Sequence, residues 1–106
     1  MLQPFNALNF LDDNGNPAGG SVQGVGLRIS WQNGPLGRDE DRIAPNGAFV
    51  ETVLAVAKER LEYYQGSKFA STYNANAIRA IDEALAHLHQ RTADREARGV
   101  EGTHSQ

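Results

Sequence analysis

Hydrophobic and polar residues alternate along the stretch that begins at Val25. One side of this stretch carries Val25, Leu27, Ile29 and Trp31, and the other carries Gly26, Arg28, Ser30 and Gln32. A period of two with branched and aromatic side chains predicts a half-buried strand. The apolar segment 5–11 is its expected partner strand. The turn-forming run 12–17 and the glycine pair Gly19-Gly20 separate the two.

After residue 45 the apolar positions recur every three or four residues, which is the spacing of a helix. A first helix is expected over 46–65, with Asn46 as N-cap and Gly66 past its end; its apolar face contains Val50, Leu54, Ala57, Leu61 and Tyr64. A second is expected over 73–98, with Asn74 near its N-cap and Gly99 after it; its apolar stripe contains Ile78, Ile81, Leu85, Leu88 and Thr92. The short connection predicts an antiparallel hairpin.

These elements predict a single α+β domain over residues 1–106. A β region (1–37) is followed by a loop (38–45), the long two-helix hairpin and a tail (99–106). Two antiparallel strands do not form a stable sheet alone. We therefore expect the hairpin to cover them and a second subunit to complete the sheet.

Composition narrows the classes of function. The chain has a net charge of −3 and no cysteine. Disulfides, thiolate zinc sites and cysteine nucleophiles are therefore excluded, and duplex nucleic acid is a poor partner for an acidic protein. The N-terminus lacks a signal-peptide pattern, and no apolar run approaches the roughly 20 residues that span a bilayer. We expect no membrane association and a cytoplasmic location.

The end of the second predicted helix concentrates positive charge. Arg91, Arg95 and Arg98 are spaced four and three residues apart, and His87 precedes them on the same side. A solvated face that complements the helix dipole is one interpretation. The other is a phosphate clamp, because guanidinium groups bind phosphate oxygens with two parallel hydrogen bonds. Asp94 and Glu96 are alternative partners for these arginines.

A second candidate surface begins at Trp31. A lone Trp on a strand is usually a core residue. Here it precedes a glycine-rich turn, and stacking of a base on such a ring with backbone and amide donors beside it is the alternative; the candidates in that turn are Gln32, Asn33, Gly34 and Leu36. The turn lacks the Lys-Ser/Thr end of a P-loop.

Aromatic side chains gather around the predicted hairpin turn. Tyr64 is expected in the core. Tyr63, Phe69 and Tyr73 either pack, meet a partner or line a pocket. Catalytic patterns are weak, because His87 and His89 lie on different helix faces and no serine sits in an elbow motif. We therefore expect no metal, no cofactor and no enzymatic activity.

Three segments resemble the phage family called Thoeris anti-defence protein one, whose helical-hairpin domain also occurs in an anti-CBASS sponge. The matching segments are 34–37, 45–51 and 90–104. The resemblance implies an N-terminal β-sheet with two long helices, and ligand pockets between subunits of a dimer or hexamer. It also implies a sponge that holds cyclic ADP-ribose isomers, such as glyco-cyclic ADP-ribose, without cleaving them. Some members also hold cyclic oligonucleotides.

The resemblance also implies roles for individual residues. Arg91 would contact phosphate, Asn74 would hydrogen-bond the ligand, Tyr64 would stack on its base, and Arg38 or Arg42 would be a second phosphate partner. The set of candidate ligand-binding residues is completed by Phe49, Arg95, Thr103 and His104. Two other functions stay open. They are a helical-hairpin module that binds a partner protein, and a small nucleotide hydrolase.

Overall fold

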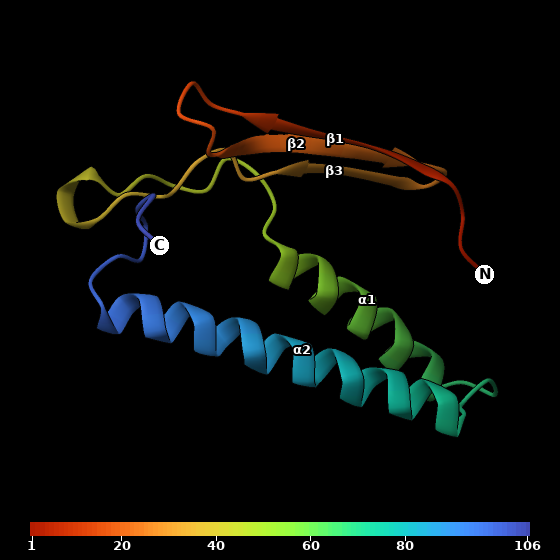
Figure 1. The fold of residues 1–106 in the computed structure, drawn as a ribbon. Coiled ribbons are helices and arrows are strands. Elements are labelled where there is room, and N and C mark those ends of the chain that lie inside the picture. The colour runs from red at the N-terminus through yellow and green to blue at the C-terminus, as the bar shows by residue number, and fades with distance from the viewer. The chain divides into compact units, whose positions relative to one another are not determined.

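The computed structural model describes all residues of the chain, 1–106. They form two compact units, one of residues 1–49 with 100–106 and one of residues 50–99. The assignment of the whole chain to one domain stays a prediction. Three antiparallel strands precede two helices (Figure 1), which confirms the α+β class.

The first unit is built on a three-stranded antiparallel sheet of β1 (Phe5–Leu11), β2 (Pro17–Gly24) and β3 (Leu27–Trp31), in that order. The predicted pairing of segment 5–11 with the strand after Val25 is wrong. β2 lies between them and pairs with both. In the sequence its Gly19-Gly20 pair has the pattern of a turn, because a glycine-rich strand has no alternation of apolar and polar side chains.

Close backbone approach explains the glycine at position 20. Gly20 pairs with Asn9 of β1 and has a φ of +148°. A Cβ atom there would clash with the carbonyl oxygen of Leu8. Only glycine tolerates both the conformation and the contact. The glycine pair thus brings β2 against β1 and does not end it.

The outer edge of β3 is covered by the chain that precedes the first helix. Ala48 forms a parallel bridge with Trp31, with Ala48 N donating to Ser30 O at 2.7 Å and Gln32 N donating to Ala48 O at 2.9 Å. The predicted helix start at residue 46 and the predicted N-cap at Asn46 are therefore wrong. The bridge at Ala48 and the bonds of Asn46 to Gln32 and Asn33 keep this segment out of the helix, which begins at Val50.

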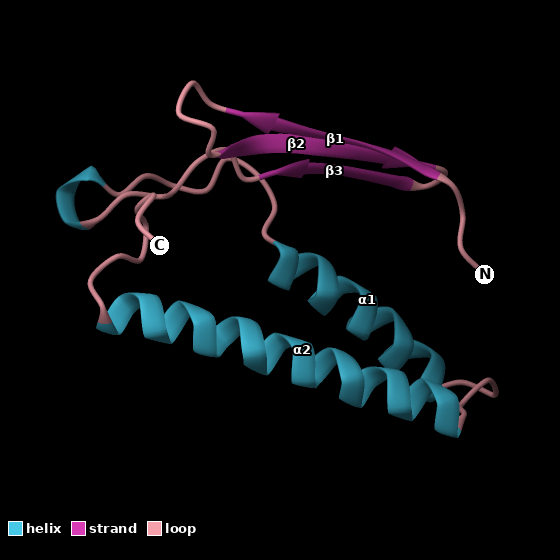
Figure 2. Ribbon diagram, in the orientation of Figure 1, coloured by secondary structure: helices cyan, strands magenta, loops and turns pink.

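The second unit is a helical hairpin of α1 (Val50–Gln65) and α2 (Thr72–Ala97), shown as the two long helices of Figure 2. The N-cap of α2 is Ser71 and not Asn74, because the Ser71 hydroxyl accepts a hydrogen bond from Asn74 N at 3.0 Å. The Gln65 amide clamps the connection by bonding both main-chain groups of Ser71, at 2.9 and 3.0 Å. Gly99, with a φ of +74°, follows the end of α2 as predicted.

The two helices pack through one partly covered stripe each. All five residues predicted for the stripe of α2 are half-buried. The predicted face of α1 is wrong at Val50, Ala57 and Tyr64, which are exposed. The prediction is confirmed at Leu54 and Leu61. The other half-buried positions of α1 are Glu51, Val53, Lys58 and Gln65. Lys58 is covered because its ammonium binds Asp82 of α2 at 2.7 Å.

Burial within this chain is sparse. Val22 of β2 is the one hydrophobic side chain that is buried, and neither helix contains a buried residue. Apolar residues stay open on both units, including Phe5, Leu8, Leu11, Val56 and Tyr63. Burial of apolar surface is the main favourable contribution to folding, so this much exposed apolar surface favours association. Neither helix is long and apolar enough to cross a bilayer.

Candidate functional site

The candidates that follow β3 form a closed hydrogen-bond network with Asn46. Asn46 N donates to Gln32 Oε1 at 2.8 Å, and Asn33 N donates to Asn46 Oδ1 at 2.8 Å. The Asn46 amide returns a bond to Asn33 O at 3.2 Å, while Gln32 Nε2 bonds Gly34 O at 3.2 Å. The donors predicted to face a base are thus used to shape this turn. Trp31 beside them is half-buried.

A second group of candidates meets at the C-terminal tail. Arg42 forms two contacts with the Glu101 carboxylate, Nη1 to Oε2 at 2.9 Å and Nη2 to Oε1 at 3.2 Å. Arg38 Nη1 donates to the backbone oxygen of Glu101 at 3.0 Å. Gly37 N donates to Gly102 O at 2.9 Å. The structure therefore brings Arg38 and Arg42 together with the tail, from which they are far apart in sequence. Both arginines bind Glu101 of the tail.

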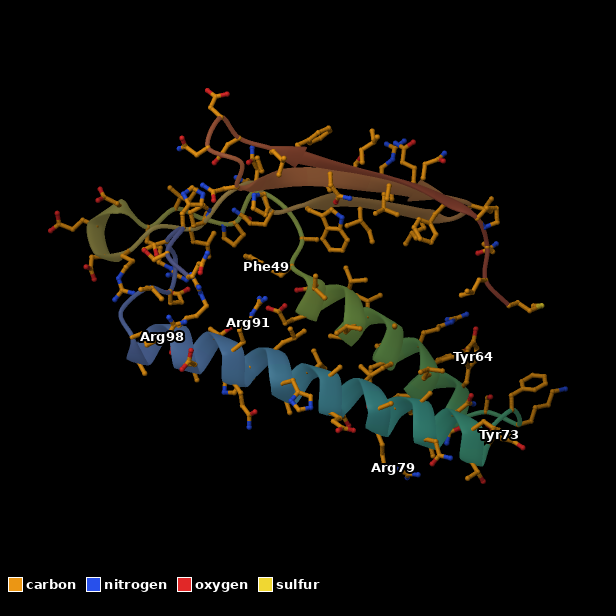
Figure 3. All side chains as sticks on the ribbon, in the orientation of Figure 1. Phe49, Tyr64, Tyr73, Arg79, Arg91 and Arg98 are labelled. Atoms are coloured by element: carbon orange, nitrogen blue, oxygen red, sulfur yellow. The ribbon has the colours of Figure 1, made fainter.

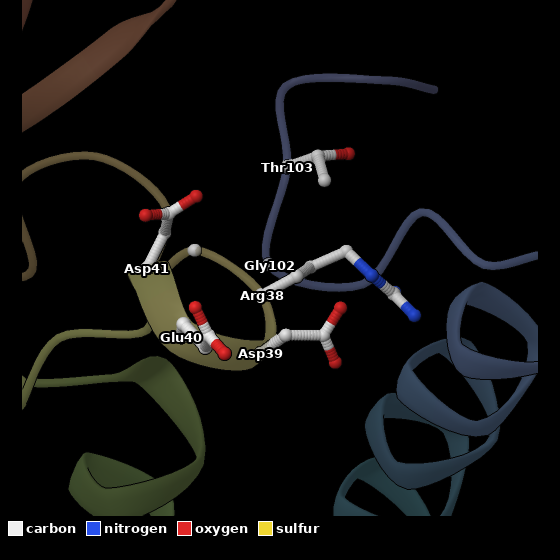
Figure 4. Close-up of a pocket in the computed structure, with 7 residues that line it drawn as sticks. Arg38, Asp39, Glu40, Asp41, Gly102 and Thr103 are labelled. Atoms are coloured by element: carbon white, nitrogen blue, oxygen red, sulfur yellow. The ribbon is translucent and has the colours of Figure 1, made fainter.

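An open recess of about 650 Å³ lies beside this junction (Figure 4). Arg38 and Thr103 line it together with Asp39, Glu40 and Asp41, which form a short 3-10 helix in the predicted loop. Asp39 has a φ of +52°, the one left-handed conformation among the non-glycine residues. Three carboxylates around one guanidinium disfavour a free phosphate at this surface.

Leu36 and His104 support the same part of the unit. Leu36 O accepts from Ile43 N at 2.7 Å, which closes the loop that carries both arginines. The His104 imidazole lies 3.9 Å from the Asp12 carboxylate in the β1–β2 turn. Asp12 also accepts from the backbone N–H groups of Asn14 and Asn16, and the bond from Asn16 contributes most to holding the pKa of Asp12 below its ordinary value. His104 is thus placed at an acidic turn.

In the hairpin unit, Tyr64 lies at the end of α1 beside a cation that the sequence analysis missed. Arg60 Nε donates to the Tyr64 hydroxyl at 3.2 Å, and its guanidinium lies 5.0 Å from the Tyr64 ring and 4.9 Å from the Tyr63 ring. The hydrogen bond to Tyr64 is the main cause that raises the pKa of Arg60. The spacing of four residues between Arg60 and Tyr64 was the available signal.

Asn74 supports the helix connection. Its backbone N–H bonds the Ser71 cap, and its side-chain Nδ2 donates to Phe69 O at 3.2 Å. Three aromatic side chains around this connection are open to solvent, Tyr63 at 62%, Phe69 at 67% and Tyr73 at 86%. This end of the hairpin thus offers aromatic rings, one amide and the Arg60 guanidinium.

The arginines near the C-terminal end of α2 differ in their interactions within the chain. Arg98 is paired with Asp94 at 3.0 Å, as the alternative interpretation of this cluster expected, and His87 lies 3.8 Å from Glu83. Arg95 is half-buried. Arg91 is exposed and forms no hydrogen bond or ion pair within the chain. Figure 3 shows Arg91 and Arg98 toward the C-terminal end of α2, with Tyr64 and Tyr73 at the opposite end of the hairpin.

Two of the strongest candidates are far apart on one helix. Asn74 lies in the first turn of α2, and Arg91 lies seventeen residues later. At a rise of 1.5 Å per residue, their backbones are separated by about 25 Å. Within one hairpin, the two residues therefore form no common pocket for a small molecule. No group of three or more His, Asp or Glu residues is arranged to hold a metal ion.

The match to known proteins centres on the hairpin. A family described as "Acb2/Tad1, hairpin domain" matches residues 23–93. The chain belongs to the Acb2/Tad1 hairpin-domain family. Its resemblance to the Thoeris anti-defence family is thereby confirmed, and the hairpin matched by this family carries Tyr64, Asn74 and Arg91.

A phage relative of this chain is named for its role in anti-defence. This chain is 43% identical over 76 residues to "Thoeris anti-defense 1" of Bacillus phage SBSphiJ7. The alignment covers 72% of this chain and 51% of that relative. This chain thus spans about half the length of its phage relative.

Proposed function

We propose that this protein is a phage anti-defence sponge that binds cyclic ADP-ribose signals, such as glyco-cyclic ADP-ribose, in the host cytoplasm and does not cleave them. Membership of the Acb2/Tad1 family and the name of the phage relative support the anti-defence role. The observation that carries the ligand assignment is the uncommitted guanidinium of Arg91 in the matched hairpin.

The chemistry of the hairpin suits a nucleotide diphosphate. A guanidinium binds phosphate oxygens through charge-assisted hydrogen bonds, which are stronger than neutral ones. The rings at the hairpin turn suit stacking on a base, which contributes about 1–3 kcal/mol per base. Sequestration requires preformed donors and no group that attacks a bond. Cyclic oligonucleotides carry the same two chemical features and are further candidate ligands.

The separation of Asn74 from Arg91 supports a pocket shared between chains. If both contact one ligand, Arg91 of one hairpin faces the turn end of a second hairpin. An antiparallel pair of identical hairpins has this geometry at each end, because a two-fold interface repeats every contact. The exposed apolar residues of α1, including Val50 and Val56, supply surface for such association. We therefore propose a homo-oligomer, either a dimer or a hexamer, as the functional unit.

Isothermal titration with glyco-cyclic ADP-ribose tests the proposal. Hydrogen bonds to charged groups contribute about 1.5–3 kcal/mol, so Arg91→Ala is expected to weaken binding by about 10-fold to 100-fold. Arg79→Ala is the matched control, because Arg79 is exposed on the same helix and bonds Asn76 beside it. Equal affinities for the two variants would contradict the role of Arg91. No binding by the unmodified protein would reject the ligand.

The exposed rings at the hairpin turn favour one second candidate function, a module that binds a partner protein. Phe69 and Tyr73 are 67% and 86% exposed, and aromatic residues are enriched at protein interfaces. Under this alternative, cyclic nucleotides leave the melting temperature unchanged. Under the sponge proposal, a ligand at 100 times its Kd stabilises the fold by about 2.7 kcal/mol.

A further inference from the structure

We propose that Glu101 is a specificity residue whose carboxylate occupies the phosphate-binding position of Arg42 and excludes simple phosphates from it. The inference rests on the proposed function and takes Arg42 as the second phosphate partner, a role that the family resemblance implies for Arg38 or Arg42. In it, the ligand's phosphate replaces the Glu101 carboxylate on the guanidinium. Anions with few other contacts do not compete with a carboxylate that the chain itself supplies.

The geometry of the pair is the geometry of phosphate recognition. Two nitrogens of Arg42 meet two oxygens of Glu101 at 2.9 and 3.2 Å. A guanidinium binds the oxygens of a phosphate through the same parallel pair of bonds. The Arg42 side chain is 44% exposed and that of Glu101 is 22% exposed, so an incoming anion can reach the guanidinium.

The backbone attachments of the tail do not depend on this carboxylate. Arg38 bonds the main-chain oxygen of Glu101, and Gly37 N bonds Gly102 O. A Cβ atom at Gly102 would clash with the Gly37 oxygen, which shows how closely the tail lies against the loop. A rotation of the Glu101 side chain therefore removes its two carboxylate contacts from Arg42 while the tail stays in place. Arg42 Nη1 also donates to the Gly37 backbone oxygen at 3.3 Å, which helps to hold the guanidinium in position.

The surrounding charge strengthens the exclusion. Asp39, Glu40 and Asp41 line the adjoining recess with Arg38. With Arg42 neutralised by Glu101, an approaching anion meets mostly negative side chains. Orthophosphate and ordinary mononucleotides are repelled. A ligand that is also held by other contacts has enough binding energy to displace one carboxylate.

Binding of inorganic diphosphate, measured by titration calorimetry at low salt, tests the inference directly. Glu101→Gln removes the competing charge and is expected to bind diphosphate about two- to fivefold more tightly than the unmodified protein, within the effect of a partly exposed ion pair. Glu40→Gln removes the same charge from the neighbouring loop without touching Arg42. This control is expected to change the affinity by less than twofold.

Two further variants assign any gain to Arg42. Glu101→Asp keeps the charge but shortens the side chain, and is expected to give an intermediate gain. The double variant Arg42→Gln with Glu101→Gln is expected to abolish the gain in affinity for diphosphate. Equal gains in Glu101→Gln and Glu40→Gln, weaker or absent binding by Glu101→Gln, or a gain that survives loss of Arg42 would each overturn the inference.

The diphosphate titration and the glyco-cyclic ADP-ribose titration distinguish failure of this inference from failure of the sponge proposal. If the unmodified protein fails to bind glyco-cyclic ADP-ribose while Glu101→Gln still gains affinity for diphosphate, the sponge is rejected and the role of Glu101 stands. If glyco-cyclic ADP-ribose binds but Glu101→Gln gains no affinity for diphosphate, the role of Glu101 is rejected and the sponge proposal stands. Circular dichroism melting of each variant verifies that it is folded.

Discussion

Asn74 and Arg91 lie on the same helix, α2, about 25 Å apart along its axis. Both are candidate ligand contacts, and Figure 3 shows Tyr64 with Tyr73 at the end of the hairpin opposite Arg91. One small ligand does not reach both within a hairpin. The proposed pocket therefore combines the turn end of one hairpin with the Arg91 end of another.

This arrangement predicts complementation between two inactive variants. Asn74→Ala and Arg91→Ala are each expected to lose binding. When the two are unfolded together and refolded at equal concentrations, about half of the dimers are mixed, and each mixed dimer has one intact site. Binding of glyco-cyclic ADP-ribose is expected to recover to about one quarter of the normal number of sites, as counted by calorimetry.

The matched control refolds Arg91→Ala with Arg91→Lys, a mixture that yields no site with the original pair of residues. Recovery only in the first mixture supports a shared pocket. No recovery in either mixture, with each variant folded and oligomeric, would place the whole pocket within one chain.

The cap of α2 gives a prediction about stability. Ser71→Ala removes the hydroxyl that accepts from Asn74 N, and loss of a helix N-cap costs about 1 kcal/mol. Ser71→Asn keeps an acceptor and is expected to restore most of the free energy of unfolding. Urea unfolding followed by circular dichroism measures both. Equal loss in the two variants would show that the hydroxyl does not act as a cap.

The ion pair between the helices predicts a loss of stability at high pH. The hydrogen bond to Asp82 is the main cause that raises the pKa of Lys58 above its ordinary value of 10.5. A base with a raised pKa stabilises the fold fully below its ordinary pKa, and this contribution disappears as pH rises through the folded value. At pH 7 the unmodified protein is expected to have a higher melting temperature than Asp82→Asn. This difference in melting temperature is expected to shrink above pH 10.5. A difference that persists at pH 12 would contradict this pairing.

The β1–β2 turn predicts the opposite dependence at low pH. Backbone N–H groups of Asn16 and Asn14 bond the Asp12 carboxylate and hold its pKa below the ordinary value of 3.8. An acid with a lowered pKa contributes stability above its ordinary pKa and loses it as pH falls through the folded value. The unmodified protein is expected to melt at a higher temperature than Asp12→Ala above pH 3.8, with the difference narrowing as pH falls below 3.8. A constant difference down to pH 2 would exclude this contribution.

The sequence predicted those parts of the fold whose signal is periodic. Ile78, Ile81 and Leu85 follow a helical repeat, and their stripe is half-buried as expected. β2 was missed because Gly19 and Gly20 provide no alternation and usually indicate a turn. The start of α1 was missed because Asn46 resembles an N-cap, while its bonds to Asn33 across thirteen residues are tertiary.

The candidate site shows the same division. The family resemblance implies roles for Arg38, Arg42 and Thr103, and these residues do lie in one part of the fold. Their attachment to Glu101 and Gly102 was not predictable, because it joins segments about sixty residues apart through side-chain geometry. Arg60 was not predicted, because a single arginine four residues before a tyrosine is a weak signal beside the arginine cluster at the end of α2.

Recovery of the ligand after capture tests the central claim most directly. The protein is mixed with a slight deficiency of glyco-cyclic ADP-ribose, free ligand is removed by filtration, and the retained protein is denatured by heat. Mass spectrometry of the released material is expected to show the intact cyclic molecule in near-stoichiometric amount. Release of a linear product, or passage of the ligand through the filter before heating, would contradict the account.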